Sequence, residues 1–197
     1  VNYSQILISI SIMNIFVCLS VLSYCHVYCS PSHLTLHVLI LFHTKMAPNI
    51  NIISLNCNGL RINTCTKLHE IDILIKLHHI DILILQETHI DNQTSATDIQ
   101  NKLKCRNAIW SFGTNRSCGV ALLNFNVQID FSKFDTDFDG RFICLDLILN
   151  TIPYRIINIY APNSDSTKNE FLNTLYPFLS GRHNLILAGD FNCVLTS

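Results

Sequence analysis

The residues best suited to chemistry in this sequence lie in the stretch 184–192, Asn-Leu-Ile-Leu-Ala-Gly-Asp-Phe-Asn. Residues 185–188 are apolar and predict a short buried strand. Gly189 is expected to let the backbone turn sharply, so that Asp190 and Asn192 emerge together at the strand's C-terminal end. A carboxylate that accepts a proton, beside an amide that donates to an anionic oxygen, suits attack by water on a phosphate ester. The alternative interpretation is a polar turn that closes a core strand.

Two earlier strands are expected to end on polar side chains that could join this pair. Residues 49–55 are rich in β-branched and apolar residues and lead into Asn56. Apolar residues then recur at helical spacing over 68–79, and a buried strand over 80–86 leads to Glu87. A strand–helix–strand unit of this length forms a parallel crossover, which leaves both strand ends on one edge of the sheet. Asn56 and Glu87 should therefore lie side by side.

The remainder of the chain predicts an antiparallel pair of strands and a closing helix. Residues 141–149 and 154–160 predict the pair, and its second strand leaves Tyr160 at its end because Pro162 and Asn163 stop the strand. The first helix is expected to be capped by Asn63 or Thr64, and a short helix is expected over 99–104. A turn over 113–119 and a strand over 120–123 should follow. The last helix is expected to be capped by Ser166 or Thr167, with core residues Phe171, Leu172, Leu175, Phe178 and Leu179.

Polar groups at four predicted strand ends favour a site for a hard cation. Mg²⁺ keeps most of its waters and needs only one or two carboxylates, which Glu87 with help from Asn56 could supply. Near a phosphodiester, the ion would neutralise developing charge. Asp190 would then polarise the attacking water, while Asn192 and Tyr160 donate to phosphate oxygens.

Other potential metal ligands fit less well. Asp135, Asp137 and Asp139 lack the layout and the final Glu of an EF-hand loop, which predicts a solvated loop. The nine histidines form no HExxH motif and the nine cysteines form no CxxC pair. We therefore expect reduced, intracellular thiols in place of a disulfide framework or a zinc site.

Composition separates an uncharged leader from the body of the chain. Of 197 residues, 49% are hydrophobic, the formal net charge is -1, and residues 1–44 contain no Asp, Glu, Lys or Arg. The apolar run 5–24 is long enough to span a bilayer, but no Lys or Arg precedes it. One hypothesis makes residues 1–45 read-through sequence ahead of a natural start at Met46, and the other makes them a signal or membrane anchor. The slightly acidic body excludes a protein that holds nucleic acid by charge alone.

Four motifs in the body resemble those of the endonuclease/exonuclease/phosphatase family. They are Ser-Leu-Asn-Cys-Asn-Gly-Leu at 54–60, Leu-Gln-Glu-Thr-His at 85–89, Ile-Tyr-Ala-Pro-Asn at 159–163 and Gly-Asp-Phe-Asn at 189–192. Within that family they are most similar to the apurinic-type endonuclease domain of LINE-like (non-LTR) retrotransposons. The resemblance covers about residues 49–195.

The resemblance implies a DNA-nicking, metal-dependent phosphodiester hydrolase with Mg²⁺, or Mn²⁺ in its place, as cofactor. It assigns the following roles: Glu87 as metal ligand, Asn56 in the metal and phosphate site, Tyr160 and Asn163 as phosphate or DNA contacts, Asp190 as activator of the water, and Asn192 as stabiliser of the pentavalent phosphate. Asn58 stands where relatives often have Asp, so a metal role there is not expected.

The resemblance also implies a fold, which this chain would form incompletely. The family fold is a four-layer α/β/β/α sandwich of two facing mixed sheets with outer helices, and residues 46–197 would supply its N-terminal part. The family's further metal-site Asp and its closing Ser-Asp-His motif do not occur after Asp190. We therefore expect the polypeptide 1–197 to be marginally stable and to have little or no activity. Strong magnesium-dependent nicking by the pure polypeptide would contradict this expectation.

Alternative functions and partners follow from the same motifs. One alternative is another phosphoesterase of the family; another is a non-enzymatic, decayed transposon fragment or small membrane protein. DNA is the expected substrate, and a reverse transcriptase in the same full-length polyprotein is the expected partner. The expected location is nuclear or cytoplasmic, or a membrane if residues 5–24 are a genuine transmembrane segment.

Overall fold

The structure, a computed structural model, describes residues 50–60, 65–114, 116–137, 139–181 and 183–192. The leader over 1–45, Met46, and the candidate caps Asn63 and Thr64 lie outside these residues. In the described part of the chain, no helix is long and apolar enough to cross a membrane.

The first sheet contains the strand–helix–strand unit that the sequence predicts. Its strands β1 (Ile52–Asn56), β2 (Ile82–Gln86), β4 (Val120–Asn124) and β3 (Asn107–Ser111) lie in the order β1-β2-β4-β3. β1 and β2 are parallel, with Asn56 opposite Gln86, and helix α1 (Cys65–Leu77) connects them. Both strands are buried along their whole length because each lies beneath a layer on either side.

The second sheet has the order β5-β6-β7-β8, formed by β5 (Lys133–Thr136), β6 (Phe142–Leu149), β7 (Ile152–Tyr160) and β8 (Asn184–Asp190). β6 and β7 form the predicted antiparallel hairpin. Its turn contains Asn150 and Thr151, both at positive φ, as a tight hairpin turn requires. β8 is parallel to β7, and this register places Asp190 opposite Tyr160.

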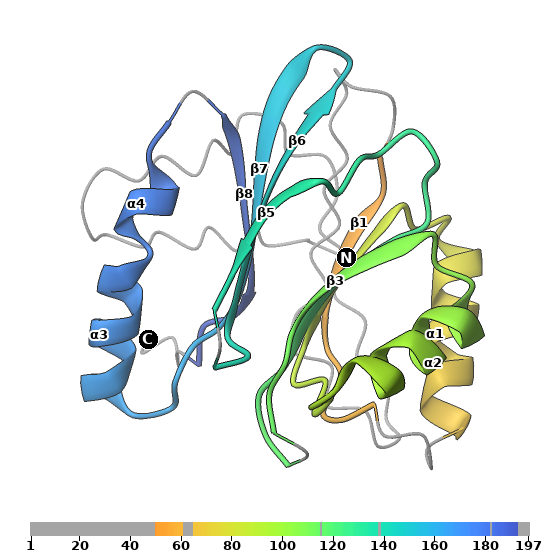
Figure 1. Ribbon diagram of the computed structural model, residues 1–197, viewed down its shortest axis with the longest axis horizontal. Coiled ribbons are helices and arrows are strands. Elements are labelled where there is room, and N and C mark those ends of the chain that lie inside the picture. Colours follow the sequence, from red (N-terminus) through yellow and green to blue (C-terminus); the bar gives the residue numbers. More distant parts are fainter. Residues whose placement is uncertain (1–49, 61–64, 115, 138, 182, 193–197) are drawn as a thin grey trace, which may run out of the picture.

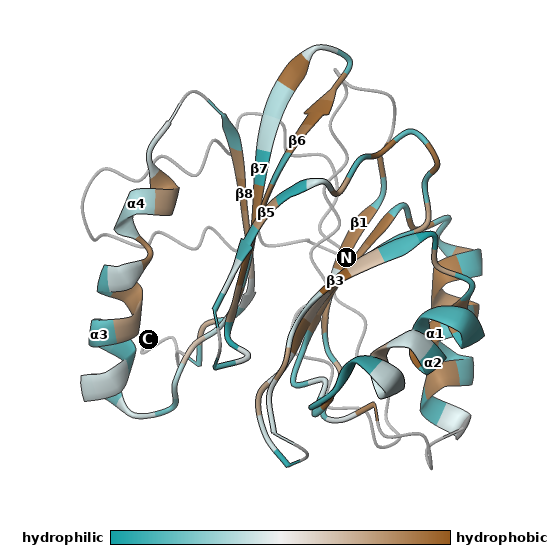
Figure 2. Ribbon diagram, viewed as in Figure 1, coloured by the Kyte–Doolittle hydropathy of each residue, from teal (hydrophilic) through white to brown (hydrophobic). Residues whose placement is uncertain are grey.

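The two sheets face each other and the helices lie outside them (Figure 1). Helices α1 and α2 (Gln93–Leu103) cover the first sheet, and α3 (Asp165–Thr174) and α4 (Tyr176–Leu179) cover the second. The predicted α/β/β/α layering is thus confirmed. In Figure 2 the strands are largely apolar, and the helices turn their hydrophilic residues away from the sheets.

The core between the sheets is apolar, and the buried polar side chain of Asn158 bridges it. Side chains such as Ile84 and Leu122 from the first sheet pack against Leu145 and Ile156 from the second. Asn158 of β7 crosses this layer: its Nδ2 donates to the carbonyls of Leu85 (2.9 Å) and Ala121 (3.1 Å), and its Oδ1 accepts from Gln86 Nε2 (2.7 Å). Since a buried amide must find partners, these bonds fix how one sheet sits on the other.

Four sequence expectations are wrong in detail. Helix α3 begins at Asp165 after Ser164, so the expected caps Ser166 and Thr167 lie inside the helix. The helix expected over 99–104 begins earlier, at Gln93, because the Asn92 side chain caps it by accepting from Ser95 N at 2.9 Å. Part of the expected Asp loop is strand β5. Asp137, which follows that strand, accepts from the backbone amides of Arg141 and Phe142, both at 3.0 Å.

The fourth correction concerns Gly189, which does not make a sharp turn. β8 continues through it to Asp190. Gly189 has φ 134°, and a Cβ there would lie 2.0 Å from the carbonyl oxygen of Ile159. The glycine is therefore needed because the backbones of β7 and β8 approach closely at this point.

Candidate active site

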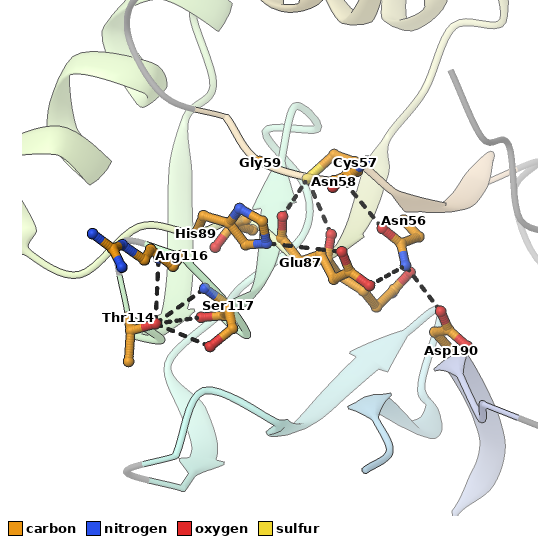
Figure 3. A network of polar contacts seen from close by, with 12 residues as sticks. Asn56, Cys57, Asn58, Gly59, Glu87, His89, Thr114, Arg116, Ser117 and Asp190 are labelled. Carbon is orange, nitrogen blue, oxygen red and sulfur yellow. Dashed lines mark hydrogen bonds and ion pairs between the residues drawn. The ribbon is translucent and has the colours of Figure 1, made fainter. Parts of the chain in front are cut away.

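Residues from both sheets meet at the ends of four strands. Asn56 ends β1, Glu87 follows β2, Tyr160 ends β7 and Asp190 ends β8. Asn56 Nδ2 donates to Glu87 Oε1 at 3.1 Å and to Asp190 Oδ2 at 2.9 Å, so one amide joins a carboxylate of each sheet (Figure 3). The predicted proximity of Asn56 and Glu87 is confirmed. Asp190, 134 residues from Asn56 in sequence, lies at the same point.

Left-handed backbone conformations occur at Glu87 and at three residues close to it or to Asp190 in sequence or space. Asn58 (φ 44°), Glu87 (φ 51°), His89 (φ 55°) and Asn192 (φ 48°) all have positive φ. This region is sparsely populated for residues other than glycine, and such residues cluster at functional sites. Strand periodicity carries no information about these conformations, so the sequence did not predict them.

The loop after β1 is bonded directly to the backbone around Glu87. Cys57 N donates to Gln86 O (2.9 Å) and Gly59 N donates to Glu87 O (2.6 Å). Burial raises the pKa of the Cys57 thiol to about 12, and its Sγ lies 3.0 Å from Gln86 O. Cys57 therefore stays a protonated packing residue and not a nucleophile.

Tyr160 is a buried hydroxyl donor at the site. Only 9% of its surface is exposed. Burial raises the pKa of its hydroxyl, and the neighbouring Glu87 carboxylate raises this pKa further. The guanidinium carbon of Arg141 lies over the ring, 5.2 Å from the ring centroid. The same guanidinium donates to the backbone carbonyl of Tyr160 at 3.1 Å. The phenol therefore remains protonated and able to donate throughout the physiological pH range.

Asp190 and Asn192 do emerge together, as predicted. The backbone N–H of Asn192 donates to Asp190 Oδ1 at 2.9 Å, and the Asn192 side-chain amide donates to Ala161 O. Lys168 of α3 donates to Asn192 O at 2.7 Å and so ties the covering helix to this loop. The sequence reasoning missed Lys168, because a lysine within a helix usually lies in solvent.

The other predicted or neighbouring residues are less central. Asn163 is exposed on the loop after β7, and the Asn58 side chain is also exposed. Neither is joined to the Asn56–Glu87–Asp190 group through its side chain by the bonds given above. His89 Nε2, by contrast, lies 3.8 Å from Glu87 Oε2. The sequence contained a signal for this contact, since His89 stands two residues after Glu87 in the Gln-Glu-Thr-His motif.

The donor set at the strand ends fits a hard cation. Within the described residues, no three His, Cys, Asp or Glu side chains form a metal-binding group on their own. Glu87 and Asp190 nevertheless supply carboxylate oxygens on either side of Asn56, and Mg²⁺ requires only one or two carboxylates besides water. Asn56 Oδ1 accepts from Asn58 N at 3.1 Å and keeps a second lone pair.

Comparison with known proteins places this geometry in a family. The sequence model of the endonuclease/exonuclease/phosphatase family matches residues 53–197, which include every residue of the site described above. The chain belongs to this family. Its members are phosphoesterases, which is the class of chemistry that the strand-end residues predict.

Solved structures of the family share the fold of this chain. D. rerio TDP2 complexed with single-strand DNA product is 14% identical, with a TM-score of 0.59. An AP endonuclease from Archaeoglobus fulgidus is 23% identical, with a TM-score of 0.53. The 3′ phosphatase NExo from Neisseria, bound to a product DNA hairpin, is 25% identical, with a TM-score of 0.51. The matches cover 74%, 73% and 72% of this chain, but only 61%, 57% and 57% of those structures.

Proposed function

We propose that this protein is a divalent-metal-dependent hydrolase of DNA phosphodiesters, the nicking endonuclease of a LINE-like retrotransposon. The observation that supports this most is the Asn56 amide, which is bonded to Glu87 of the first sheet and Asp190 of the second. Two carboxylates held side by side at a strand edge suit a reaction that needs both a cation and a base.

In this proposal Asp190 accepts the proton of the attacking water. Its Oδ1 and Oδ2 each accept one hydrogen bond, from Asn192 N and Asn56 Nδ2, and these bonds orient the carboxylate. On substrate binding, Tyr160 would turn its hydroxyl hydrogen from Glu87 to a phosphate oxygen. The Asn192 side-chain amide donates to Ala161 O and also contacts the Tyr160 hydroxyl, and its second N–H would turn to another phosphate oxygen.

Glu87 would hold the cation, with Asn56 beside it. A bound Mg²⁺ or Mn²⁺ supplies neutralisation of the charge that develops on the phosphate and the leaving oxygen. Asn56 keeps the two carboxylates in place through its two N–H groups. Asn163, exposed beyond Tyr160, is proposed as a contact to the DNA backbone.

Two observations favour DNA over other phosphate esters. The motifs Gln-Glu-Thr-His and Ile-Tyr-Ala-Pro-Asn resemble the corresponding motifs of LINE-like endonucleases. Solved relatives of the same fold hold a single-strand DNA product or a DNA hairpin product. The formal net charge of the chain is -1, so the cation would contribute much of the attraction to phosphate.

The test is nicking of supercoiled plasmid with protein in excess over DNA. We expect Mg²⁺-dependent conversion to open circles that EDTA abolishes. Asp190→Asn should lower the rate about 100-fold or more, because it removes the base but keeps the side-chain shape. Asp98→Asn, an exposed carboxylate on α2, is the control and should nick like the original protein.

A second substrate separates nicking from end-processing. An oligonucleotide with a 3′-phosphate reports phosphatase activity of the kind named for the Neisseria relative. Release of phosphate without plasmid nicking would replace the endonuclease proposal with a phosphomonoesterase. Equal nicking by the original protein and Asp190→Asn would refute the proposed chemistry.

A further inference from the structure

We propose that Lys67 of α1 is a positioning residue for this site. Its side chain holds the loop 57–59 in the shape that aligns Asn56 with Glu87. The inference rests on the proposed function for its link to catalysis. The contact itself is a property of the fold.

Lys67 donates to three successive backbone carbonyls. Its Nζ lies 2.8 Å from Cys57 O, 2.8 Å from Asn58 O and 2.9 Å from Gly59 O. An ammonium group has three hydrogens and no acceptor, so this loop uses all of its donors. Three consecutive carbonyls can face the same side only where the backbone is irregular. The positive φ values of Asn58 (44°) and Gly59 (85°) make it irregular here.

The opposite side of the same loop is bonded to the site. Gly59 N donates to Glu87 O at 2.6 Å, Leu60 N donates to Thr88 O at 2.8 Å, and Asn58 N donates to Asn56 Oδ1 at 3.1 Å. Figure 3 shows this loop alongside Glu87 and Asn56. The carbonyls of the loop are therefore held by Lys67, while its amides hold the backbone of the proposed metal ligand.

The location of Lys67 argues against an ordinary surface role. It is the third residue of α1, and a cation in the first turn of a helix is opposed by the helix dipole. Among the described residues, no carboxylate lies within 4 Å of its Nζ to form an ion pair, unlike Lys76 on the same helix, which pairs with Asp72. Without a cation the three carbonyl dipoles would converge and repel one another, so the loop would open.

The experiment measures amide hydrogen exchange of Gly59 and Leu60 in the full chain, together with Mn²⁺ affinity, for Lys67→Ala and for Lys76→Ala. Lys76 is 69% exposed, so its variant is a matched control on the same helix. We expect Lys67→Ala to speed exchange at both amides by about tenfold or more, because a charge-assisted set of hydrogen bonds is lost. Mn²⁺ binding should weaken by a similar factor, and Lys76→Ala should change neither.

Added propylammonium supplies the missing group and separates positioning from general stability. If the ammonium itself holds the loop, millimolar propylammonium should restore slow exchange and Mn²⁺ affinity to Lys67→Ala while leaving the original protein unchanged. Unchanged exchange in Lys67→Ala would overturn the loop contact, and faster exchange with unchanged Mn²⁺ affinity would overturn the positioning role. If the original protein binds no Mn²⁺, the proposed function fails, whereas the exchange rates still decide whether Lys67 holds the loop.

Discussion

Tyr160 shows how one side chain is tuned at this site. Its hydroxyl is buried beside Glu87, and both features favour the protonated form and raise its pKa. A phenol that stays protonated remains a hydrogen-bond donor throughout the physiological pH range. The same burial means that removal of the oxygen leaves the ring packing intact.

We predict that Tyr160→Phe lowers the rate of DNA hydrolysis about 10- to 100-fold, because one donor to the phosphate is lost. The Mn²⁺ affinity should change little. The pH–rate profile of the original protein should show no inflection from Tyr160 between pH 7 and 10, since its hydroxyl does not ionise there. A fall in rate near pH 10 that disappears in Tyr160→Phe would contradict this account.

At the residue scale, the sequence predicts which groups form the site but not how they are aimed. Asn56, Glu87, Tyr160 and Asp190 could be found because each ends or follows an apolar strand, and parallel strands bring such ends to one edge. The left-handed conformation of Glu87 leaves no trace in hydrophobic periodicity. The contacts of the two lysines Lys67 and Lys168 were missed because they depend on tertiary packing.

At the element scale, β8 brings Asp190 to Tyr160 through a close approach to β7. Gly189→Ala should destabilise the fold by about 2–4 kcal/mol, because the new Cβ would lie 2.0 Å from the Ile159 carbonyl oxygen. Gly181→Ala is the matched control: its φ is 138°, close to the 134° of Gly189, but the nearest atom that its Cβ would meet among the described residues is in the His183 side chain, at 3.0 Å. Urea unfolding measures both, and an equal loss in the two variants would refute the steric explanation.

Arg155 attaches helix α4 to the second sheet and also forms an ion pair with Asp146. This ion pair makes the free energy of unfolding depend on pH. Arg155 donates to Asp146 at 2.6 and 2.9 Å and also to the carbonyls of Phe178 and Ser180 at the end of α4. The hydrogen bonds from Arg155 lower the pKa of Asp146 to about 2. Because the folded pKa lies below the unfolded value, the stabilisation is present above about pH 4 and is lost as pH falls towards 2.

We predict that Asp146 contributes about 2 kcal/mol to the free energy of unfolding and that this contribution disappears between pH 5 and pH 2. Asp146→Asn should therefore be less stable at pH 6, and its stability should change less with pH. Asp146 is only 11% exposed, so solvent screens this pair weakly. Asp72→Asn, which breaks the exposed pair with Lys76, should change stability by less than about 0.5 kcal/mol. Parallel pH profiles for Asp146→Asn and the original protein, from urea unfolding, would contradict the prediction.

Most elements were predictable from periodicity, with exceptions that have physical causes. The α1 and β6–β7 segments have strong helical or strand patterns and lie where expected. Helix α2 begins with polar residues, so only its cap, Asn92, marks the start. β5 is exposed along its length, and an edge strand of this kind has no hydrophobic alternation to reveal it.

At the scale of the whole molecule, the site exists only because two sheets are held in one relative position. Asn158 provides the buried polar link between them. The facing sheets were expected from the resemblance of the motifs to a family. The sequence alone does not indicate which polar residue crosses the core, because Asn158 lies within an apolar strand and looks like an interruption.

We predict that Asn158→Ala destabilises the fold by about 2–4 kcal/mol, because Gln86 and two buried carbonyls lose a partner. Asn184→Ala is the control, since Asn184 is exposed on β8 and its side chain donates to Pro153 O at 3.2 Å near the surface. It should cost less than about 0.5 kcal/mol. Comparable losses in the two variants, measured by urea unfolding, would mean that the link between the sheets is not important.

The central claim is that Glu87, joined through Asn56 to Asp190 of the other sheet, holds a divalent cation. The most direct measurement is a titration of the protein with Mn²⁺ followed by electron paramagnetic resonance, for the original protein, Glu87→Gln and the control Asp139→Asn. The account predicts one Mn²⁺ bound by the original protein and by Asp139→Asn, and affinity at least about tenfold weaker in Glu87→Gln. Equal affinity in all three proteins, or no Mn²⁺ bound by any, would contradict it.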